Sequence, residues 1–454
     1  MTKQKIFENL IAMRAENEKN SAICERAVSV EDYSHLVIKG SDGDIWTDAF
    51  QTAINENSHI FIPSSQSPYI IDKTLLVPSN RFIEAEKGAV IRQAKGVTTL
   101  LVRNANNENG TKTPESFKAP DRNIRISGGR WEESRDSRAG YGQSGKYDEN
   151  RSFYGVSACM FFNNICGLTL ENMTFSHAGG FSIQLGNLKN VCVENITFDS
   201  CFADGVHVNG NIENILIRNI SGCVGDDLVA FNMYDWQDSS VDFGPIKCAW
   251  CENVASSENS IYKSFRILPG IYYYEDGKSV DCSLSDAVFK GIRGVKTVKL
   301  YFQTPAYDIT AEREPGDCGS ADNIYFEDIS LDLDEPCDKF PVYTSSDPVL
   351  GSIAGFEIGA NIKDIYFENI KMTLHREKYP MSFFACAGPK SCRIENLEIF
   401  DPEISCTVKN IHLKDVFVNG ETENLSEYIH EIDFADYYGD GKAVGKGIIE
   451  NITL

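Results

Sequence analysis

The chain has 454 residues, of which 42% are hydrophobic and 24% charged, so it can bury a sizeable core and is not a disordered polypeptide. Its 43 Lys and Arg residues face 66 Asp and Glu residues, which gives a formal net charge of −23. A surface this acidic repels phosphate backbones, so we expect no nucleic-acid partner. It also disfavours long polyanionic substrates, unless a local basic patch overrides the global field. The basic residues that could form such a patch are Lys290, Arg293, Lys296 and Lys299.

The first twenty residues are polar and interrupted by charges, without the apolar region or cleavage motif of a signal peptide. No later stretch approaches the roughly 18 apolar residues that a membrane-spanning helix needs. We therefore expect a cytoplasmic protein with no membrane partner, whose 14 cysteines are buried thiols and not disulfides. Cys248 and Cys251 form a CAWC pair, but no second ligand pair follows at zinc spacing, so a structural role is favoured.

Residues 1–40 are expected to form a helical N-terminal extension. Four apolar residues lie at helical spacing there: Phe7, Leu10, Ile11 and Ala15. A second helix should begin near Thr47 and Asp48, which are suitable N-cap residues. The apolar residues of that helix are Ala49, Phe50, Ala53 and Ile54.

Beyond this helix the sequence pattern changes to that of β-strands, and one sequence motif recurs along the chain. Its copies are GLTLENMTF (167–175), NVCVENITF (190–198), NILIRNISG (214–222), NIYFEDISL (323–331), DIYFENIKM (364–372) and NIHLKDVFV (410–418). The equivalent residues Asn172, Asn195 and Asn219 lie 23 and 24 positions apart. A fixed period of alternating strands without intervening helices predicts an all-β solenoid, a right-handed parallel β-helix over residues 41–454. The repeated Asn side chains should form an inward ladder at a coil bend.

Two stretches interrupt the period, residues 104–155 and residues 232–245. Insertions in a solenoid emerge as loops and commonly form one binding face. The repeat itself does not identify the ligand of that face.

Three acidic residues stand out where consecutive coils are aligned. Asp204 and Asp227 are 23 residues apart, one coil, so they should stack at about the strand spacing, with Asp226 beside them. Carboxylates this close repel one another, so at least one should hold a proton near neutrality. The cluster would then supply both the acid and the base that glycosidic bond cleavage needs. Because strand neighbours point to opposite faces, Asp226 and Asp227 can share a site only at a bend or bulge. The alternative is a solvated acidic turn.

The chain resembles the polygalacturonase family, glycoside hydrolase family 28. The resemblance covers about residues 40–270 and rests on SDGDIWTDAFQTAI (41–54), FIPSSQSPYII (61–71), LLVPSNRFIEAEKGAVI (75–91), SHAGGFSIQ (176–184), ADGVHV (203–208), VGDDLVAFN (224–232) and SFRILPG (264–270). It implies that Asp226 is the general acid, that Asp204 and Asp227 activate water, and that the anomeric configuration is inverted. We expect no obligatory metal and no other cofactor, because the three aspartates are assigned to proton transfer and no His/Cys cluster has the spacing of metal ligands.

The departures from the family pattern concern substrate binding. Phe202 stands where the family has Asn, two positions before Asp204, and residues 232–245 replace its Gly-His-Gly coil. The family's Arg-Ile-Lys becomes Arg266, Ile267 and Leu268, and losing that lysine weakens the case for galacturonate.

Further candidate residues for substrate binding lie near the three aspartates in sequence. They are His177, His207, Asn232, Tyr234, Trp236, Lys263 and Arg266. Tyr234 and Trp236 would offer aromatic platforms for sugars, with core packing as the alternative. Strand alternation puts His207 on the face opposite Asp204, and both a functional and a buried role stay open. For His177 a structural role is favoured.

The sequence therefore predicts an inverting glycoside hydrolase acting on small oligosaccharides, including pectin-derived ones. Two other classes stay open. A uronate lyase or epimerase would need a basic residue, for which Arg266 with Lys263 is available, often with calcium. A non-catalytic carbohydrate-binding β-helix is the third class, and the three aspartates argue against it.

Overall fold

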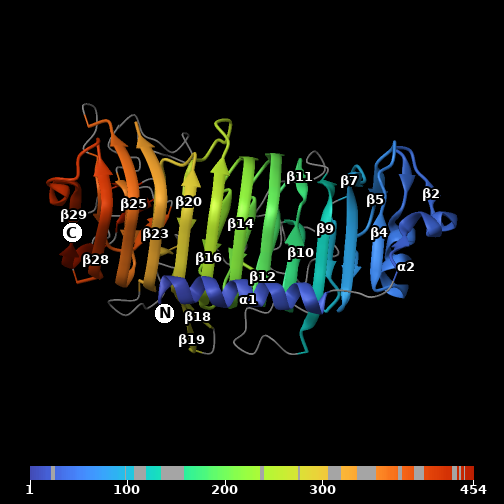
Figure 1. Ribbon diagram of the computed structural model, residues 1–454, viewed down its shortest axis with the longest axis horizontal. Helices are drawn as coiled ribbons and strands as arrows, with labels where there is room; N and C mark the ends of the chain where they lie inside the picture. The colour runs from blue at the N-terminus through green and yellow to red at the C-terminus, as the bar shows by residue number, and fades with distance from the viewer. Residues whose placement is uncertain are drawn as a thin grey trace. The chain divides into compact units, whose positions relative to one another are not determined.

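The computed structural model describes residues 1–21, 26–97, 99–106, 119–133, 158–235, 240–274, 277–304, 318–334, 354–376, 381–392, 403–431, 437–438, 441–443 and 445–454. The chain is a right-handed parallel β-helix with short helices near its N-terminus, which confirms the predicted fold class. Its helices and strands are labelled in Figure 1. The chain divides into two compact units. The first unit comprises Phe7–Val229 and Trp236–Phe243, and the second comprises Met1–Ile6, Ala230–Asp235 and Gly244–Leu454. None of the described helices is long and apolar enough to cross a membrane.

The chain up to residue 224 forms helices α1 (Lys3–Asn20), η1 (Val30–Leu36) and α2 (Thr47–Glu56) and strands β1 (Val28–Ser29), β2 (Ile38–Lys39), β3 (Asp44–Ile45), β4 (His59–Ile62), β5 (Tyr69–Ile71), β6 (Leu75–Val77), β7 (Arg81–Gln93), β8 (Val102–Asn104), β9 (Asp121–Glu132), β10 (Ala158–Glu171), β11 (Thr174–Ser176), β12 (Phe181–Cys201), β13 (Val206–Asn209) and β14 (Ile212–Val224).

From there on it forms β15 (Val229–Asn232), β16 (Ile246–Ser256), β17 (Ser264–Ile267), β18 (Gly270–Tyr273), β19 (Ser279–Cys282), β20 (Leu284–Arg293), β21 (Thr297–Tyr301), β22 (Gln303–Thr304), β23 (Ser320–Leu333), β24 (Ala354–Gly359), β25 (Asn361–Leu374), β26 (Ser382–Cys386), β27 (Lys390–Cys392), β28 (Ser405–Val418), η6 (Leu425–Tyr428), β29 (Ile429–Glu431), β30 (Tyr437–Tyr438), β31 (Gly441–Ala443) and β32 (Lys446–Thr453).

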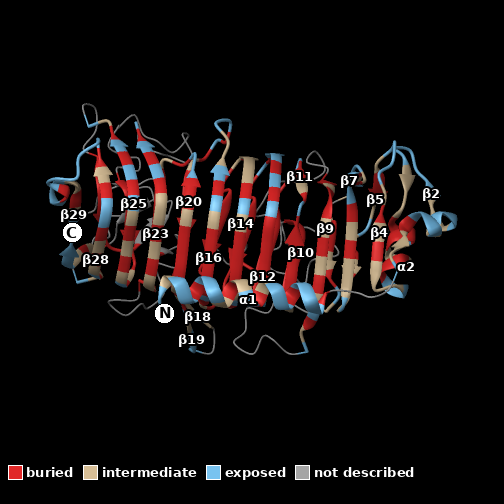
Figure 2. Ribbon diagram, in the orientation of Figure 1, coloured by how far each residue is buried: buried red, intermediate tan, exposed pale blue. Residues whose placement is uncertain are grey.

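Equivalent residues of successive coils stack in parallel register. In the first unit, Leu168 of β10 pairs with Val191 of β12, which pairs with Ile215 of β14. All three side chains are buried. Figure 2 shows buried stretches, in red, along β10, β12 and β14. Burying such a side chain contributes about 1.5–3 kcal/mol, so the repeated apolar positions supply the core of the solenoid. The predicted coil period of 23 or 24 residues is the step of this register.

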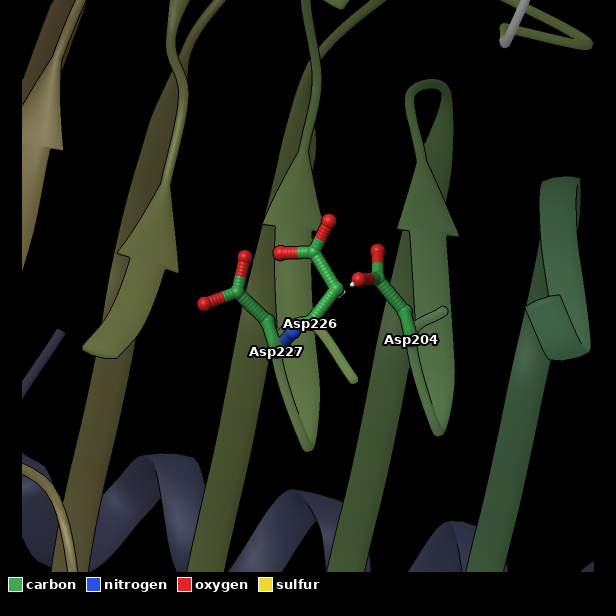
Figure 3. Close-up of side chains that lie close together, drawn as sticks. All are labelled: Asp204, Asp226 and Asp227. Carbon is green, nitrogen blue, oxygen red and sulfur yellow. Dashed lines mark hydrogen bonds between the residues drawn. The ribbon is translucent and has the colours of Figure 1, made fainter. Parts of the chain in front are cut away.

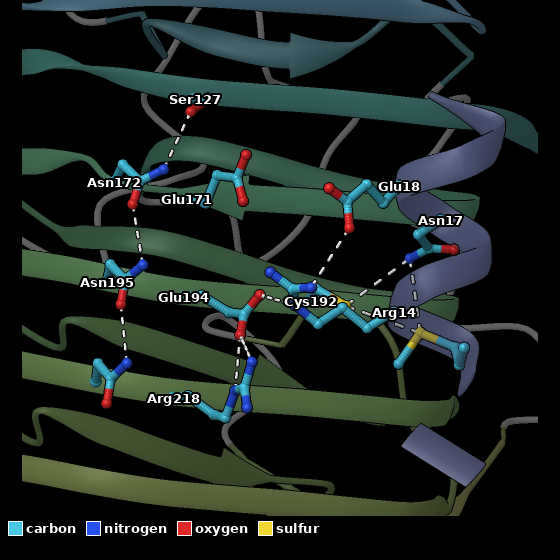
Figure 4. Close-up of polar contacts among 12 residues, drawn as sticks. Arg14, Asn17, Glu18, Ser127, Glu171, Asn172, Cys192, Glu194, Asn195 and Arg218 are labelled. Atoms are coloured by element: carbon cyan, nitrogen blue, oxygen red, sulfur yellow. Dashed lines mark hydrogen bonds and ion pairs between the residues drawn. The ribbon is translucent and has the colours of Figure 1, made fainter. Parts of the chain in front are cut away.

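The repeated asparagines form a ladder at one bend of the first unit (Figure 4). Asn172, Asn195 and Asn219 have φ of 59°, 56° and 57°, a left-handed conformation that Asn tolerates. The Nδ2 group of Asn195 donates to Oδ1 of Asn172 at 2.9 Å, and that of Asn219 donates to Oδ1 of Asn195 at 2.8 Å. The ladder is confirmed, but all three residues are exposed, so the prediction that it points inward is wrong. Water can solvate the remaining amide groups, which an apolar interior could not do.

Helix α1 packs on the first unit through a face that the sequence only partly indicated. Leu10, Met13 and Asn17 are buried, and Asn17 Nδ2 donates to the Asn190 carbonyl at 2.8 Å. Arg14 Nε donates to the buried carboxylate of Glu194 at 2.6 Å (Figure 4). The predicted face was correct for Leu10, whereas Phe7 is 36% exposed. In α2, by contrast, the four predicted residues are all buried: Ala49, Phe50, Ala53 and Ile54.

The two predicted insertions differ from simple loops where the structure describes them. Strand β9 lies within 104–155 and pairs in parallel with β7 and β10, so this stretch contributes strand residues to the coils. In the stretch 232–245, Val241 and Asp242 are buried. Cys248 and Cys251 are free, buried thiols, in agreement with a structural role.

Candidate active site

Two bends in adjacent coils of the first unit hold the three aspartates. Asp204 lies between β12 and β13, and Asp226 and Asp227 lie between β14 and β15. The two bends are joined by backbone hydrogen bonds, because the N–H of Gly205 donates to the Asp227 carbonyl at 3.0 Å. Asp204 and Asp227 are thus equivalent residues of neighbouring coils, as the 23-residue step predicted.

All three carboxylates converge (Figure 3). One oxygen from each lies within 4.8 Å of the other two, and the residues are only 3%, 5% and 1% exposed for Asp204, Asp226 and Asp227. Asp226 and Asp227 both reach the cluster because the chain bends there, which confirms that alternation is broken at this point. Buried carboxylates this close can be accommodated only if a proton, a cation or hydrogen-bond donors compensate their charge.

Glycine makes both bends possible. A Cβ atom at Gly225 would lie 2.0 Å from the Phe202 carbonyl oxygen, and one at Gly205 would lie 2.5 Å from the Leu228 carbonyl oxygen. Neither backbone oxygen can move without breaking the coil, so a larger residue at either position would separate the bends. The glycines next to the aspartates therefore set the short distance between the carboxylates.

Asp204 is held at both oxygens. The backbone N–H of Asp227 donates to Oδ1 at 3.1 Å, and Nδ1 of His207 lies 2.6 Å from Oδ2. His207 is 1% exposed and belongs to β13. Regular strand alternation would have put His207 on the face opposite Asp204, but the chain bends at Asp204 before β13 begins, so the two side chains meet.

The other candidates in or next to the first unit lie elsewhere or outside the described residues. His177 is exposed at a turn with φ of 57°, and among the described residues the structure gives no contact between it and the aspartates. Trp236, the predicted aromatic platform, lies outside the described residues. Phe202, at the family's Asn position, is 41% exposed.

Tyr234 and Asn232 belong to the second unit and are buried there. The Tyr234 ring packs edge-on against Phe302 with 5.0 Å between centroids, and a Cβ at Gly270 would lie 2.6 Å from its Cβ. Tyr234 is 3% exposed, so core packing replaces the exposed platform predicted for it. Asn232 donates from Nδ2 to Asp235 at 3.1 Å.

Arg266 of the second unit meets a lysine that the sequence analysis did not connect with it. Arg266 on β17 and Lys299 on β21 are register partners on adjacent coils. Both donate to the Tyr262 hydroxyl, Arg266 at 3.0 Å and Lys299 at 2.5 Å, and all three side chains are buried. Glu357 is the register partner of Lys299 on the next coil and is also buried. Lys263, proposed beside Arg266, is half-buried and its carbonyl accepts from the Lys296 N–H at 2.8 Å.

The candidate basic patch is largely neutralised within the second unit. Lys290 bonds to Glu327 at 2.6 Å, Lys296 pairs with Asp334 at 2.7 Å, and Lys299 is fully buried. Only Arg293 of the predicted four is exposed. These lysines therefore present no open cationic surface to a polyanion.

One group of described residues has the donor set of a metal site, the three aspartates themselves. Their oxygens would suit a hard cation such as calcium or magnesium, which takes carboxylate ligands. The same oxygens are the ones needed for proton transfer, so the two uses exclude each other.

No family model matches the sequence, and no curated protein matches it significantly. The chain is similar in fold to the family 28 exopolygalacturonase of Yersinia enterocolitica, with a TM-score of 0.51, 12% identity, and coverage of 95% of this chain and 79% of that one. An exopolygalacturonase from Thermotoga maritima has a TM-score of 0.48 and 12% identity, covering 97% and 95%. The A-module of the Azotobacter vinelandii mannuronan C-5 epimerase AlgE4 has a TM-score of 0.43 and 12% identity, covering 86% and 95%. The likeness to the Yersinia structure shows the shared β-helix fold.

Proposed function

We propose that the protein is an inverting glycoside hydrolase that acts on small oligosaccharides, including pectin-derived ones that contain uronic acids. The observation that carries this proposal is the convergence of three buried carboxylates from two adjacent bends. The resemblance of these bends to those of polygalacturonases supports it, and so does the fold shared with the Yersinia exopolygalacturonase.

In the proposed reaction Asp226 donates its proton to the glycosidic oxygen as the bond to the anomeric carbon breaks. A water molecule held by Asp204 and Asp227 attacks the anomeric carbon from the opposite side and gives its proton to one of these two carboxylates. Each turnover moves one proton off Asp226 and one onto the pair, and exchange with solvent restores the starting state.

The anomeric configuration of the product is the most discriminating test of the proposed reaction, because the positions of the carboxylates are compatible with both inversion and retention. Carboxyl groups are about 6.5–9.5 Å apart in most inverting enzymes and about 5–5.5 Å apart in retaining ones. Oxygens within 4.8 Å of one another favour retention on distance alone, whereas the family resemblance favours inversion. Proton NMR of the first-formed product, recorded before mutarotation, should show the inverted anomer. A retained anomer would make one aspartate a nucleophile.

A uronate lyase or epimerase is a second candidate, and the cluster of Arg266, Lys299 and Tyr262 favours it. In such a reaction the Tyr262 oxygen, after loss of its own proton to solvent, would take the proton next to the uronate carboxylate, and the two cations that donate to that oxygen would stabilise the phenolate. Incubation with defined neutral and uronic oligosaccharides separates the candidates. A hydrolase yields new reducing ends without ultraviolet absorbance, and a lyase yields an unsaturated product that absorbs. If no substrate in the screen is changed but some are bound, the β-helix is a binding protein.

A further inference from the structure

His207 is enclosed so tightly that the protonation of each ring nitrogen can be assigned. Its ring stacks on Phe181 with 3.8 Å between centroids and 14° between planes. Nδ1 faces Oδ2 of Asp204 at 2.6 Å, and Nε2 faces Nδ2 of Asn209 at 3.2 Å. Of the neighbours of the ring named here, Asp204 is charged. Phe181, Asn209 and Gln184, the register partner of His207, are neutral. Which nitrogen carries the proton depends on the orientation of the Asn209 amide.

The Asn209 amide is oriented by a backbone group. The N–H of Val241 lies 3.3 Å from Asn209 Oδ1, and a backbone N–H can only donate. Gln184 Nε2 donates to the same oxygen at 3.0 Å. The oxygen of Asn209 must therefore face Val241 and Gln184, which leaves the NH₂ group pointing at His207.

Val241 is itself fixed by packing. It is fully buried in an apolar cluster with Phe181 and Ala203. Gly186 makes room for it, because a Cβ there would lie 2.6 Å from Val241 Cγ2. The neighbouring acid, Asp242, is buried and accepts from the Phe243 N–H at 2.8 Å. The donor that sets the Asn209 amide is thus part of the core and not of a mobile side chain.

We infer that His207 is a positioning residue, held as the neutral Nδ1–H tautomer, that keeps Asp204 ionised. Because Nε2 accepts from Asn209, the ring proton must sit on Nδ1 and be donated to Asp204. Asp204 then accepts at both oxygens, from His207 and from the Asp227 N–H, and such bonds favour the carboxylate form. The proton retained by the cluster belongs to Asp226 or Asp227. The tautomer follows from the geometry alone, whereas its use in catalysis rests on the proposed function.

Nitrogen-15 NMR of the full chain with labelled histidines tests the tautomer without any substrate. We expect the His207 resonances of a protonated Nδ1 and an unprotonated Nε2 at neutral pH. The signal is assigned by its loss in His207→Gln. If that variant does not fold, single replacements of the other six histidines assign it by elimination: His35, His59, His177, His375, His412 and His430. An Nε2–H tautomer or an imidazolium at neutral pH would overturn the inference.

Asn209→Asp changes the group that faces Nε2 and little else. Its Oδ1 can still accept from Val241 and Gln184, but its second oxygen now accepts a proton from the ring. We expect His207 to become an imidazolium in this variant at neutral pH. A ring that stays singly protonated would contradict the assigned hydrogen-bond direction. The matched control is Asn195→Asp, the same change on the exposed ladder of the same unit, which should leave the His207 spectrum unchanged.

Kinetic measurements then test whether His207 acts as a positioning residue in the reaction. Once a substrate is known, Asn209→Asp should lower kcat/KM at neutral pH at least about tenfold, because an imidazolium still donates from Nδ1 but adds a positive charge beside Asp204, which weakens that carboxylate as a base. Activity should recover as pH rises and the ring loses its extra proton. An unchanged pH profile in a variant whose ring is an imidazolium would overturn the positioning role. If the protein cleaves no glycoside, the NMR result still decides the tautomer, so the two failures are distinguishable.

Discussion

Asp226 and Asp227 are neighbours in one bend, yet the proposed reaction gives them different tasks. Replacing either carboxyl group by an amide keeps its shape and removes proton transfer. Asp226→Asn and Asp227→Asn should therefore each lower kcat by at least about a hundredfold, the usual scale for an acid or base. Turnover of the best oligosaccharide and a thermal melt of each variant would check this, since the melting temperature should change little.

The control for these variants is Asp199→Asn, the same chemical change at a residue whose exposed side chain pairs with Arg130 at 2.7 Å. It should retain nearly full turnover. Near-normal activity in both Asp226→Asn and Asp227→Asn would end the hydrolase assignment at this site.

Whether the aspartates bind a cation is a further question at the residue scale. Their oxygens are close enough to share one, but we predict no metal requirement because the proposed reaction uses all three carboxylates for water and proton transfer. Activity after exhaustive dialysis against a chelator should equal that of the untreated enzyme. Activity that is lost and then restored by calcium would favour the lyase.

At the scale of elements, α1 is held to the first unit by a narrow buried face. Leu10 is fully buried, and removing its side chain should leave a cavity that lowers stability by about 2–5 kcal/mol. Phe7, on the same helix, is 36% exposed and serves as the control. Denaturant unfolding should show a large loss for Leu10→Ala and a small one for Phe7→Ala. Equal losses would mean that the helix packs through a different face.

The first turn of α1 contributes to the second unit through an ion-pair network. Lys3 bonds to Glu368 at 2.6 Å, and Lys414 bonds to its other oxygen at 2.6 Å. The hydrogen bond from Lys3, followed by that from Lys414, lowers the pKa of Glu368 from 4.5 to about 2. A lowered pKa in the folded state means stability that is present above pH 4.5 and lost as pH falls towards 2.

We therefore expect Glu368→Gln to reduce the change in melting temperature between pH 5 and pH 2. Lys3→Met should reduce it as well, and the double variant should add less than the sum because both changes remove one interaction. Independent, additive effects would show that the pair does not form in solution. Since Glu368 is partly exposed to solvent, added salt should shrink the difference.

The strands and the aspartate cluster could be predicted from sequence because both follow from the coil period. The 23-residue step identifies Asp227 as the equivalent of Asp204, whatever surrounds them. His207 could not be placed, because the rotation of the chain at the bend is not encoded in strand alternation. Lys299 was not connected with Arg266 because the coil that separates the two residues contains the β18–β19 hairpin and is longer than the repeat. Burial of Tyr234 depends on a glycine, Gly270, far along the chain.

At the scale of the whole molecule, the net charge of −23 disfavours a long polyanionic substrate. Of the four basic residues that could have formed a cationic patch, Lys290 and Lys296 are ion-paired and Lys299 is buried, which leaves Arg293 exposed. A long polyanion would thus meet a repulsive field with a range of about 30 Å at 0.01 M salt and about 10 Å at 0.1 M. A short oligosaccharide carries too few charges for this field to matter greatly.

These ranges predict different salt dependences for a charged polymer and a neutral oligosaccharide. Raising the salt concentration from 0.01 to 0.15 M should increase kcat/KM on polygalacturonate on the order of tenfold, because screening removes the repulsion that slows encounter. The value for a neutral trisaccharide should hardly change, since that substrate does not sense the field. Initial rates on both substrates, over a salt series at fixed pH, measure the two slopes. A polymer rate that falls with salt would indicate an attractive cationic surface near the site, and small oligosaccharides would no longer be the favoured substrates.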